Sequence, residues 1–174
     1  MDKIFSAFLT TQYAEGMALA AASDLLELFV ASTSDQPQRY LARFRCTGLL
    51  YAPDGQITPG NDFSVGIWFP DDYLRRVEPA QVVTWLGPRA VWHPNIFPPF
   101  LCVGRLAPGT SLVDLLYQIF EIITYMKVTM REDDALNKEA CAWARHHQDW
   151  FPIDTRPLKR RVLDLRVESI REGK

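Results

Sequence analysis

Hydrophobic and polar residues follow a helical pattern over about the first thirty positions of the chain. Alanine, leucine and methionine are frequent there, and Glu15, Asp24 and Glu27 supply a polar side. Such residues favour helix, so we predict one continuing through Leu25–Phe29. A separate turn before Gly16 is the alternative for the first residues. Turn-forming residues after position 31 end this segment.

The pattern then alternates with a period of two, which is typical of strands. The apolar positions of the two clearest runs are Tyr40, Ala42, Phe44 and Cys46, followed by Phe63, Val65, Ile67 and Phe69. Pro53–Gly55 and Pro59–Asp62 read as turns, and residues 80–86 read as another strand. Short strands joined by tight turns indicate an antiparallel meander.

An irregular loop and two helices follow the strands. Residues 92–99 contain three prolines and cannot form a regular interior element, and Cys102 comes shortly afterwards. Apolar residues at spacings of three and four predict helices over residues 112–126, capped by Ser111 or Thr110, and over about 136–150.

The last residues of the chain alternate again. Leu163, Leu165 and Val167 favour a strand, although a helix is the alternative. No linker or repeat divides the sequence. We therefore expect a single α+β domain over residues 1–174, with a C-terminal extension from about residue 149.

Composition and charge narrow the possible functions. Hydrophobic residues make up 48% of the chain and charged residues 23%, as in an ordinary soluble globular protein. A net charge of -2 does not suggest a nucleic-acid-binding surface. No apolar run is long enough to cross a bilayer, and the first residues do not resemble a secretory signal. We therefore expect a cytoplasmic protein with no nucleic-acid or membrane partner.

The three cysteines are the first candidates for chemistry. Cys46, Cys102 and Cys141 form no CxxC pair and show no metal-ligand spacing with the histidines, so we expect no metal and no cofactor. A free cysteine is most often a small buried apolar residue. We expect that fate for Cys46, on the apolar side of a strand, and for Cys141, within a helix.

Several short motifs surround Cys102 in a characteristic order. They are Phe69-Pro70-Asp71-Asp72-Tyr73, Pro79, His93-Pro94-Asn95-Ile96, Cys102, Ala107-Pro108, and Asp133-Asp134-Ala135-Leu136-Asn137 with Glu139-Ala140. Over about residues 40–147 this order resembles ubiquitin-conjugating (E2) enzymes, with their FPxDYP, HPN and DDPLN elements. The resemblance implies the UBC fold: an N-terminal helix, a four-stranded antiparallel meander, an active-site loop, a central helix and a C-terminal helix.

The resemblance also implies an activity. Cys102, nine residues after His93, would accept a ubiquitin-like protein from an activating enzyme (E1) as a thioester and pass it to a lysine of a protein substrate. Thiol chemistry suits this task, because a thiolate is both a strong nucleophile and a good leaving group. A serine would accept the acyl group but release it poorly.

Four further residues take roles from the same resemblance. The amide of Asn95 would stabilise the oxyanion formed when lysine attacks, or would only hydrogen-bond the adjacent loop. His93 and Pro94 would fix the active-site loop. Asp134 would orient the incoming amine. Alternatively, Asp134 or Asp133 caps the following helix.

Some features depart from the E2 pattern. Val103-Gly104 follows Cys102 where an acidic residue is common, and the tryptophan of the family's WSP element is missing. The N-terminal helix lacks the basic residues that eukaryotic members present to their activating enzyme. The chain therefore resembles divergent bacterial E2 proteins of Bil and CBASS antiviral defence operons. The rival interpretations are a non-catalytic E2-like (UEV- or RWD-type) binding module and a generic domain that buries Cys102.

Overall fold

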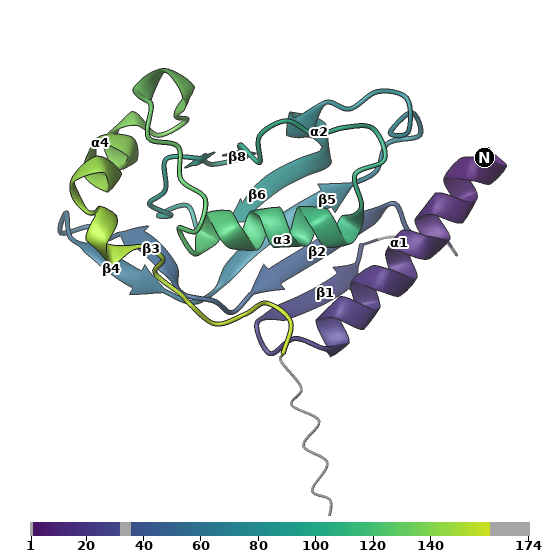
Figure 1. Ribbon diagram of the computed structural model, residues 1–174, viewed down its shortest axis with the longest axis horizontal. Coiled ribbons are helices and arrows are strands. Elements are labelled where there is room, and N and C mark those ends of the chain that lie inside the picture. Colours follow the sequence, from purple (N-terminus) through teal and green to yellow (C-terminus); the bar gives the residue numbers. More distant parts are fainter. Residues whose placement is uncertain (1, 32–35, 161–174) are drawn as a thin grey trace, which may run out of the picture.

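A four-stranded antiparallel sheet forms the centre of the protein, whose computed structural model describes residues 2–31 and 36–160 (Figure 1). Its strands, in spatial order, are β1 Leu26–Val30, β2 Arg39–Phe44, β5 Phe63–Trp68 and β6 Val83–Gly87. Two hairpins pair β3 Gly48–Tyr51 with β4 Ile57–Gly60, and β7 Ile96–Phe97 with β8 Phe100–Leu101. The helices are α1 Lys3–Ala21, α2 Pro79–Val82, α3 Leu112–Ile123 and α4 Lys138–His146, with 3-10 turns η1 Glu132–Asp134 and η2 Gln148–Trp150. The predicted α+β class, N-terminal helix and four-stranded antiparallel sheet are confirmed.

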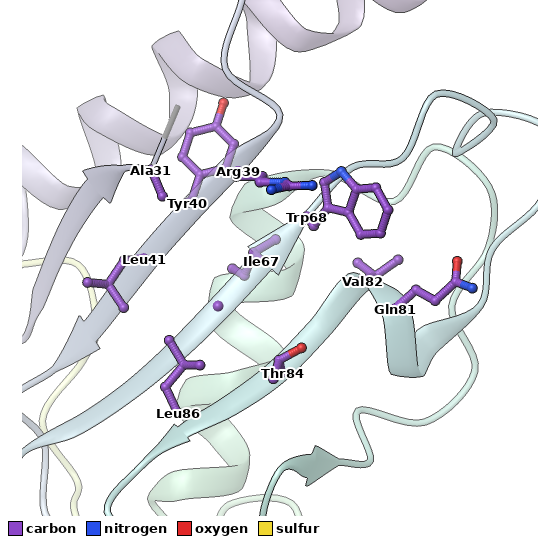
Figure 2. A pocket seen from close by; sticks show the side chains of 11 residues that line it. Ala31, Arg39, Tyr40, Leu41, Ile67, Trp68, Gln81, Val82, Thr84 and Leu86 are labelled. Carbon is purple, nitrogen blue, oxygen red and sulfur yellow. The ribbon is translucent and has the colours of Figure 1, made fainter. Parts of the chain in front are cut away.

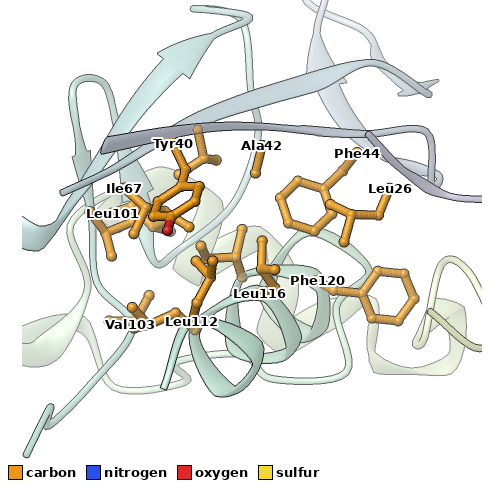
Figure 3. Close-up of a cluster of buried hydrophobic side chains, with 14 of the residues drawn as sticks. Leu26, Tyr40, Ala42, Phe44, Ile67, Leu101, Val103, Leu112, Leu116 and Phe120 are labelled. Carbon is orange, nitrogen blue, oxygen red and sulfur yellow. The ribbon is translucent and has the colours of Figure 1, made fainter. Parts of the chain in front are cut away.

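The sheet buries one face against α3. Every second residue of β2 and β5 is buried, as the alternating pattern predicts. The buried residues of α3 are Leu112, Leu115, Leu116, Ile119, Phe120, Ile122 and Ile123. Figure 3 shows side chains of α3 beneath those of β2. Burying one such side chain contributes about 1.5–3 kcal/mol, so this layer is a major source of stability. The predicted cap is also present, because the hydroxyl of Ser111 accepts a hydrogen bond from the Asp114 N–H at 3.0 Å.

Helix α1 lies beside α3 and β1 (Figure 1). It is continuous, so the predicted weak point near Gly16 does not break it. Gly16 instead permits close packing, since a Cβ atom there would lie 2.6 Å from Cδ2 of Leu112. Gln12 links the same two helices, because its buried Oε1 accepts the Leu112 N–H at 2.7 Å. Within the described residues, no helix combines the length and apolar character needed to span a bilayer.

The predicted extent of the N-terminal helix is wrong. The helix ends at Ala21, and Leu26–Val30 forms the edge strand β1, paired with β2 in the register Leu26↔Phe44. Leucine has a good helix propensity, but Leu26 and Leu28 are buried while Glu27 between them is not. This alternation suits a strand. Pairing with β2 therefore outweighs a local preference of a few tenths of a kcal/mol per residue.

Three other boundaries differ from the prediction. Pro59–Gly60, expected in a turn, lies in β4, where a Cβ on Gly60 would lie 2.6 Å from Cδ1 of Leu50. The strand expected from residue 80 begins at Val83, because Pro79 starts a short helix instead. The last predicted helix is divided into α4 and the turn η2.

A second, smaller core packs the end of the molecule that carries α4. Its buried members are Leu49, Trp92, Tyr125 and Ala140. The segment after η2 then runs back along the domain. The buried carboxylate of Asp154 accepts the Thr47 N–H at 2.7 Å, and the Arg160 N–H donates to the Ala22 carbonyl at 2.9 Å. The strand predicted around Leu163, Leu165 and Val167 lies outside the described residues.

Candidate active site

The β7–β8 hairpin places Asn95 and Cys102 opposite each other at its base. The register pairs Ile96 with Leu101 and Phe97 with Phe100, and the Cys102 N–H donates to the Asn95 carbonyl at 2.8 Å. These bonds bring together two residues that are seven positions apart in the sequence.

The side chain of Asn95 completes this pairing. In a hydrogen-bonded pair of an antiparallel ladder, the two opposing residues exchange two main-chain hydrogen bonds. Here the Asn95 N–H donates to Nδ1 of His93 at 2.9 Å, and Nδ2 of Asn95 donates to the Cys102 carbonyl at 3.2 Å. Oδ1 accepts the Thr129 N–H at 2.9 Å. Nδ2 carries two N–H bonds and meets one acceptor among the described residues, so one donor is uncommitted.

His93 is a neutral, buried support of this loop. Its side chain is 1% exposed, and burial lowers its pKa to about 3. The ring packs against the Tyr125 ring with centroids 4.3 Å apart. Tyr125 also donates its hydroxyl to the Trp92 carbonyl and has a left-handed φ of 60° just after α3. A histidine with this pKa does not exchange protons near neutral pH, so its contribution is to hold the Asn95 main chain.

The carbonyl of Pro94 joins the loop before the β7–β8 hairpin to the acidic segment. It accepts the N–H groups of Leu136 and Asn137 at 2.9 and 3.1 Å. Turn η1, which ends at Asp134, is thereby tied to the same loop as Asn95. The Asp134 side chain is 61% exposed, and its Oδ2 lies 3.5 Å from Nε of Arg131. An exposed carboxylate in this position can attract an incoming ammonium group.

Neither aspartate caps the following helix, so that alternative is wrong. Asn137 is the N-cap of α4, and its Oδ1 accepts the Ala140 N–H at 3.0 Å. Asp134 instead lies at the end of the 3-10 turn. Within the described part of the chain, Asp133 has no hydrogen-bond or ion-pair partner. Both carboxylates therefore remain open to solvent beside the loop.

The three thiols differ in accessibility. Cys102 is half-buried, and none of the described residues hydrogen-bonds its Sγ. Cys46 and Cys141 are fully buried, as the sequence predicts. Burial, followed by the charge of Asp154, raises the pKa of Cys46 to about 12. Burial also raises the pKa of Cys141, whose Sγ donates to the Thr129 carbonyl at 3.3 Å. Only Cys102 combines exposure with an unengaged sulfur.

Residues that follow α3 also hold the site, although no sequence motif indicates them. The Lys127 ammonium donates to the Val103 carbonyl at 2.9 Å, directly after Cys102. Gly104 follows with a φ of +89°, which favours glycine. Thr129 and Tyr125 hold Asn95 and the loop around His93. These contacts depend on the return of the chain after α3, so local periodicity gives no signal of them.

A hollow of about 420 Å³ lies on the sheet (Figure 2). It is lined by residues of β2, β5, β6 and α2, and Leu41, Trp68 and Leu86 contribute apolar surface to it. The guanidinium carbon of Arg39 lies 5.1 Å from the centroid of the Trp68 ring. None of the predicted site residues lines this hollow.

No model of a known protein family matches the chain, and the curated proteins include no significant sequence relative. In the described ranges, no group of three or more histidine, cysteine, aspartate or glutamate side chains is arranged to hold a metal ion.

Proposed function

We propose that this protein is an E2-type conjugating enzyme with the UBC fold. Cys102 accepts a ubiquitin-like protein from an activating enzyme and transfers it to a lysine of a protein substrate. More particularly, we propose a divergent bacterial E2 of an antiviral defence operon. The observation that carries the proposal is the pairing of a half-buried, unengaged thiol with a buried amide that keeps one N–H uncommitted.

The first step loads the carrier. The Cys102 thiolate attacks the thioester carbonyl of the charged activating enzyme, and a new C–S bond forms. The bond to the enzyme's own sulfur breaks, and that sulfur takes up a proton in place of the one that Cys102 lost. Cys102 is only half-buried, which allows this exchange, and the burial of Cys46 and Cys141 prevents their competing for the cargo.

The second step discharges the carrier. A neutral lysine amine attacks the Cys102 thioester, and the carbonyl oxygen becomes an oxyanion. The uncommitted N–H of Asn95 is the donor available to stabilise it. The intermediate expels the Cys102 thiolate, which takes up the proton that the attacking nitrogen loses, and an isopeptide bond remains. Asp134, and Asp133 beside it, attract the ammonium form of the lysine before it loses its proton.

A non-catalytic E2-like binding module is the rival function. It is favoured by the two hydrogen bonds that Asn95 already makes, to Cys102 and Thr129, which are sufficient to explain its burial. In that case Cys102 would react with a small alkylating reagent but would never take up a protein. Variants of Asn95 would likewise be alkylated at Cys102 and would take up no protein.

The deciding experiment mixes the chain with its activating enzyme, ubiquitin-like protein and ATP. We expect an adduct that dithiothreitol removes and that Cys102→Ala does not form. Cys102→Ser should give an ester that resists dithiothreitol. If the alanine variant still forms the adduct, the assignment of Cys102 is wrong.

A further inference from the structure

The tip of the β7–β8 hairpin presents two exposed phenylalanines close to Cys102. Phe97 is 57% exposed and Phe100 is 53% exposed, and they are directly opposite each other in the hairpin. Both side chains are more than half exposed and neither belongs to the buried clusters, so this apolar area does not build the core. Adjacent exposed aromatic side chains are typical of interaction sites.

The alternation of burial through β8 places Phe100 on the same side of the chain as Cys102, which directly follows this strand. Burial alternates along this stretch: Phe100 is exposed and Cys102 half-buried, while Leu101 and Val103 are buried. Alternate residues of extended chain share one face, and each residue advances the chain by about 3.3 Å. The Cα atoms of Phe100 and Cys102 are therefore about 7 Å apart. Phe97 lies across from Phe100 on that face. The two rings and the thiol therefore form one row.

The hairpin is held at both ends. At its tip, the Trp85 N–H of β6 donates to the Pro99 carbonyl at 2.8 Å. At its base, Asn95 and Cys102 make the two hydrogen bonds described above. Side chains on a fixed scaffold lose little freedom when they bind, so the two rings suit a role in selection.

Building on the proposed function, we propose that Phe97 and Phe100 form an apolar platform for the C-terminal segment of the carried ubiquitin-like protein. The platform favours an apolar side chain about two to four residues before the thioester bond. Phe97 and Phe100 would thus be specificity residues for the acyl donor.

The donor fits this platform better than the acceptor does. The donor is tethered at Sγ of Cys102, so its last residues always lie within reach of Phe100. An acceptor lysine carries a positive charge and is drawn to the carboxylates of η1, which is fixed to Pro94 at the opposite end of the hairpin from the rings. The apolar rings thus suit the donor segment, and the carboxylates of η1 suit the acceptor lysine.

The test uses two synthetic pentapeptide thioesters of mercaptoethanesulfonate. They differ only at the third residue from the thioester, which is leucine in one and glutamate in the other. The Cys102 thiolate attacks the carbonyl, mercaptoethanesulfonate leaves with the proton, and mass spectrometry follows the initial rate. We expect the wild-type protein to favour the leucine peptide by about tenfold or more, the factor that one well-placed apolar contact gives.

Paired variants show whether the rings cause this preference. Phe97→Ala/Phe100→Ala should react with both peptides at similar rates, and Phe97→Leu/Phe100→Leu should keep the preference. Leu86→Ala removes a side chain that is 55% exposed in the sheet hollow, which Phe97, Phe100 and Cys102 do not line, and should change nothing. Equal rates of iodoacetamide alkylation in all variants would show that the thiol itself is unaltered.

The inference is overturned if the wild-type protein shows no leucine preference or if the double alanine variant keeps it. If the double alanine variant keeps the preference and also discharges its cargo to free lysine more slowly, the rings serve the acceptor and not the donor. Failure of the proposed function looks different: the wild-type chain would take up no protein from the activating enzyme, whatever the peptides do.

Discussion

Replacing Asn95 with alanine separates its structural role from its catalytic role. The substitution deletes the acceptor for the Thr129 N–H and the donor to the Cys102 carbonyl. Each hydrogen bond contributes about 1 kcal/mol, and an unpaired buried N–H costs about 1–3 kcal/mol. We therefore expect the free energy of unfolding to fall by about 2–4 kcal/mol, which a domain of ordinary stability survives.

The catalytic effect should be separate and larger in discharge than in charging. Loss of one oxyanion donor costs on the order of 100-fold in rate. Asn95→Ala should therefore become charged nearly normally but transfer its cargo to free lysine about 100 times more slowly. The assay is single-turnover discharge of purified thioester, normalised to the amount charged. Asn95→Asp keeps an oxygen for Thr129 but lacks the donor, so it should be slow as well.

A matched control removes a different hydrogen bond to Thr129. Cys141→Ala removes the thiol that donates to the Thr129 carbonyl and leaves the Asn95 amide in place. It should discharge at close to the wild-type rate. If Asn95→Ala discharges as fast as the wild type, or if Cys141→Ala is equally slow, Asn95 supports the loop and the oxyanion argument is refuted.

Three further predictions follow from burial and charge. His93 has a pKa of about 3 in the folded protein against an ordinary value of 6.5, so at pH 5 the unfolded chain binds this proton and the folded protein does not. Between pH 7 and pH 5, the free energy of unfolding measured in urea should therefore fall by about 2 kcal/mol more for the wild type than for His93→Asn. Burial alone would raise the pKa of Asp154, but hydrogen bonds from Arg156 and the Thr47 N–H lower it to about 2. Asp154→Asn should thus be destabilised at pH 7, and its deficit should close as pH falls from about 4 to 2; a constant deficit would contradict the carboxylate's role. In native alkylation followed by peptide mapping, Cys102 should be modified while Cys46 and Cys141 stay protected until the protein is unfolded.

The sequence predicted those parts of the fold that local periodicity determines. The alternation around Tyr40 and Phe63 gave two central strands, and the apolar spacing after Ser111 gave α3 with its cap. Residues 26–30 were predicted as helix and not as a strand, because leucine and glutamate favour a helix locally. Their strand depends on pairing with β2, a tertiary contact that propensity does not contain.

The candidate site divides in the same way. Cys102, Asn95 and the acidic residues stand in a motif order that the sequence displays. The hydrogen bonds that relate them do not: Nδ1 of His93 takes the Asn95 N–H, and Thr129 binds Asn95 from 34 residues away. Asn137 rather than an aspartate caps α4, a choice among neighbouring cap-forming residues that composition cannot make.

Mass spectrometry of the intact charged protein shows whether Cys102 carries the cargo. We predict a complex with the mass of the chain plus its ubiquitin-like cargo minus one water. After unfolding, alkylation of this complex should modify Cys46 and Cys141 but not Cys102. Treatment with dithiothreitol should restore the free chain and make Cys102 reactive again. A complex that leaves Cys102 free, or one whose bond survives dithiothreitol in the wild-type protein, would contradict the assignment of a Cys102 thioester.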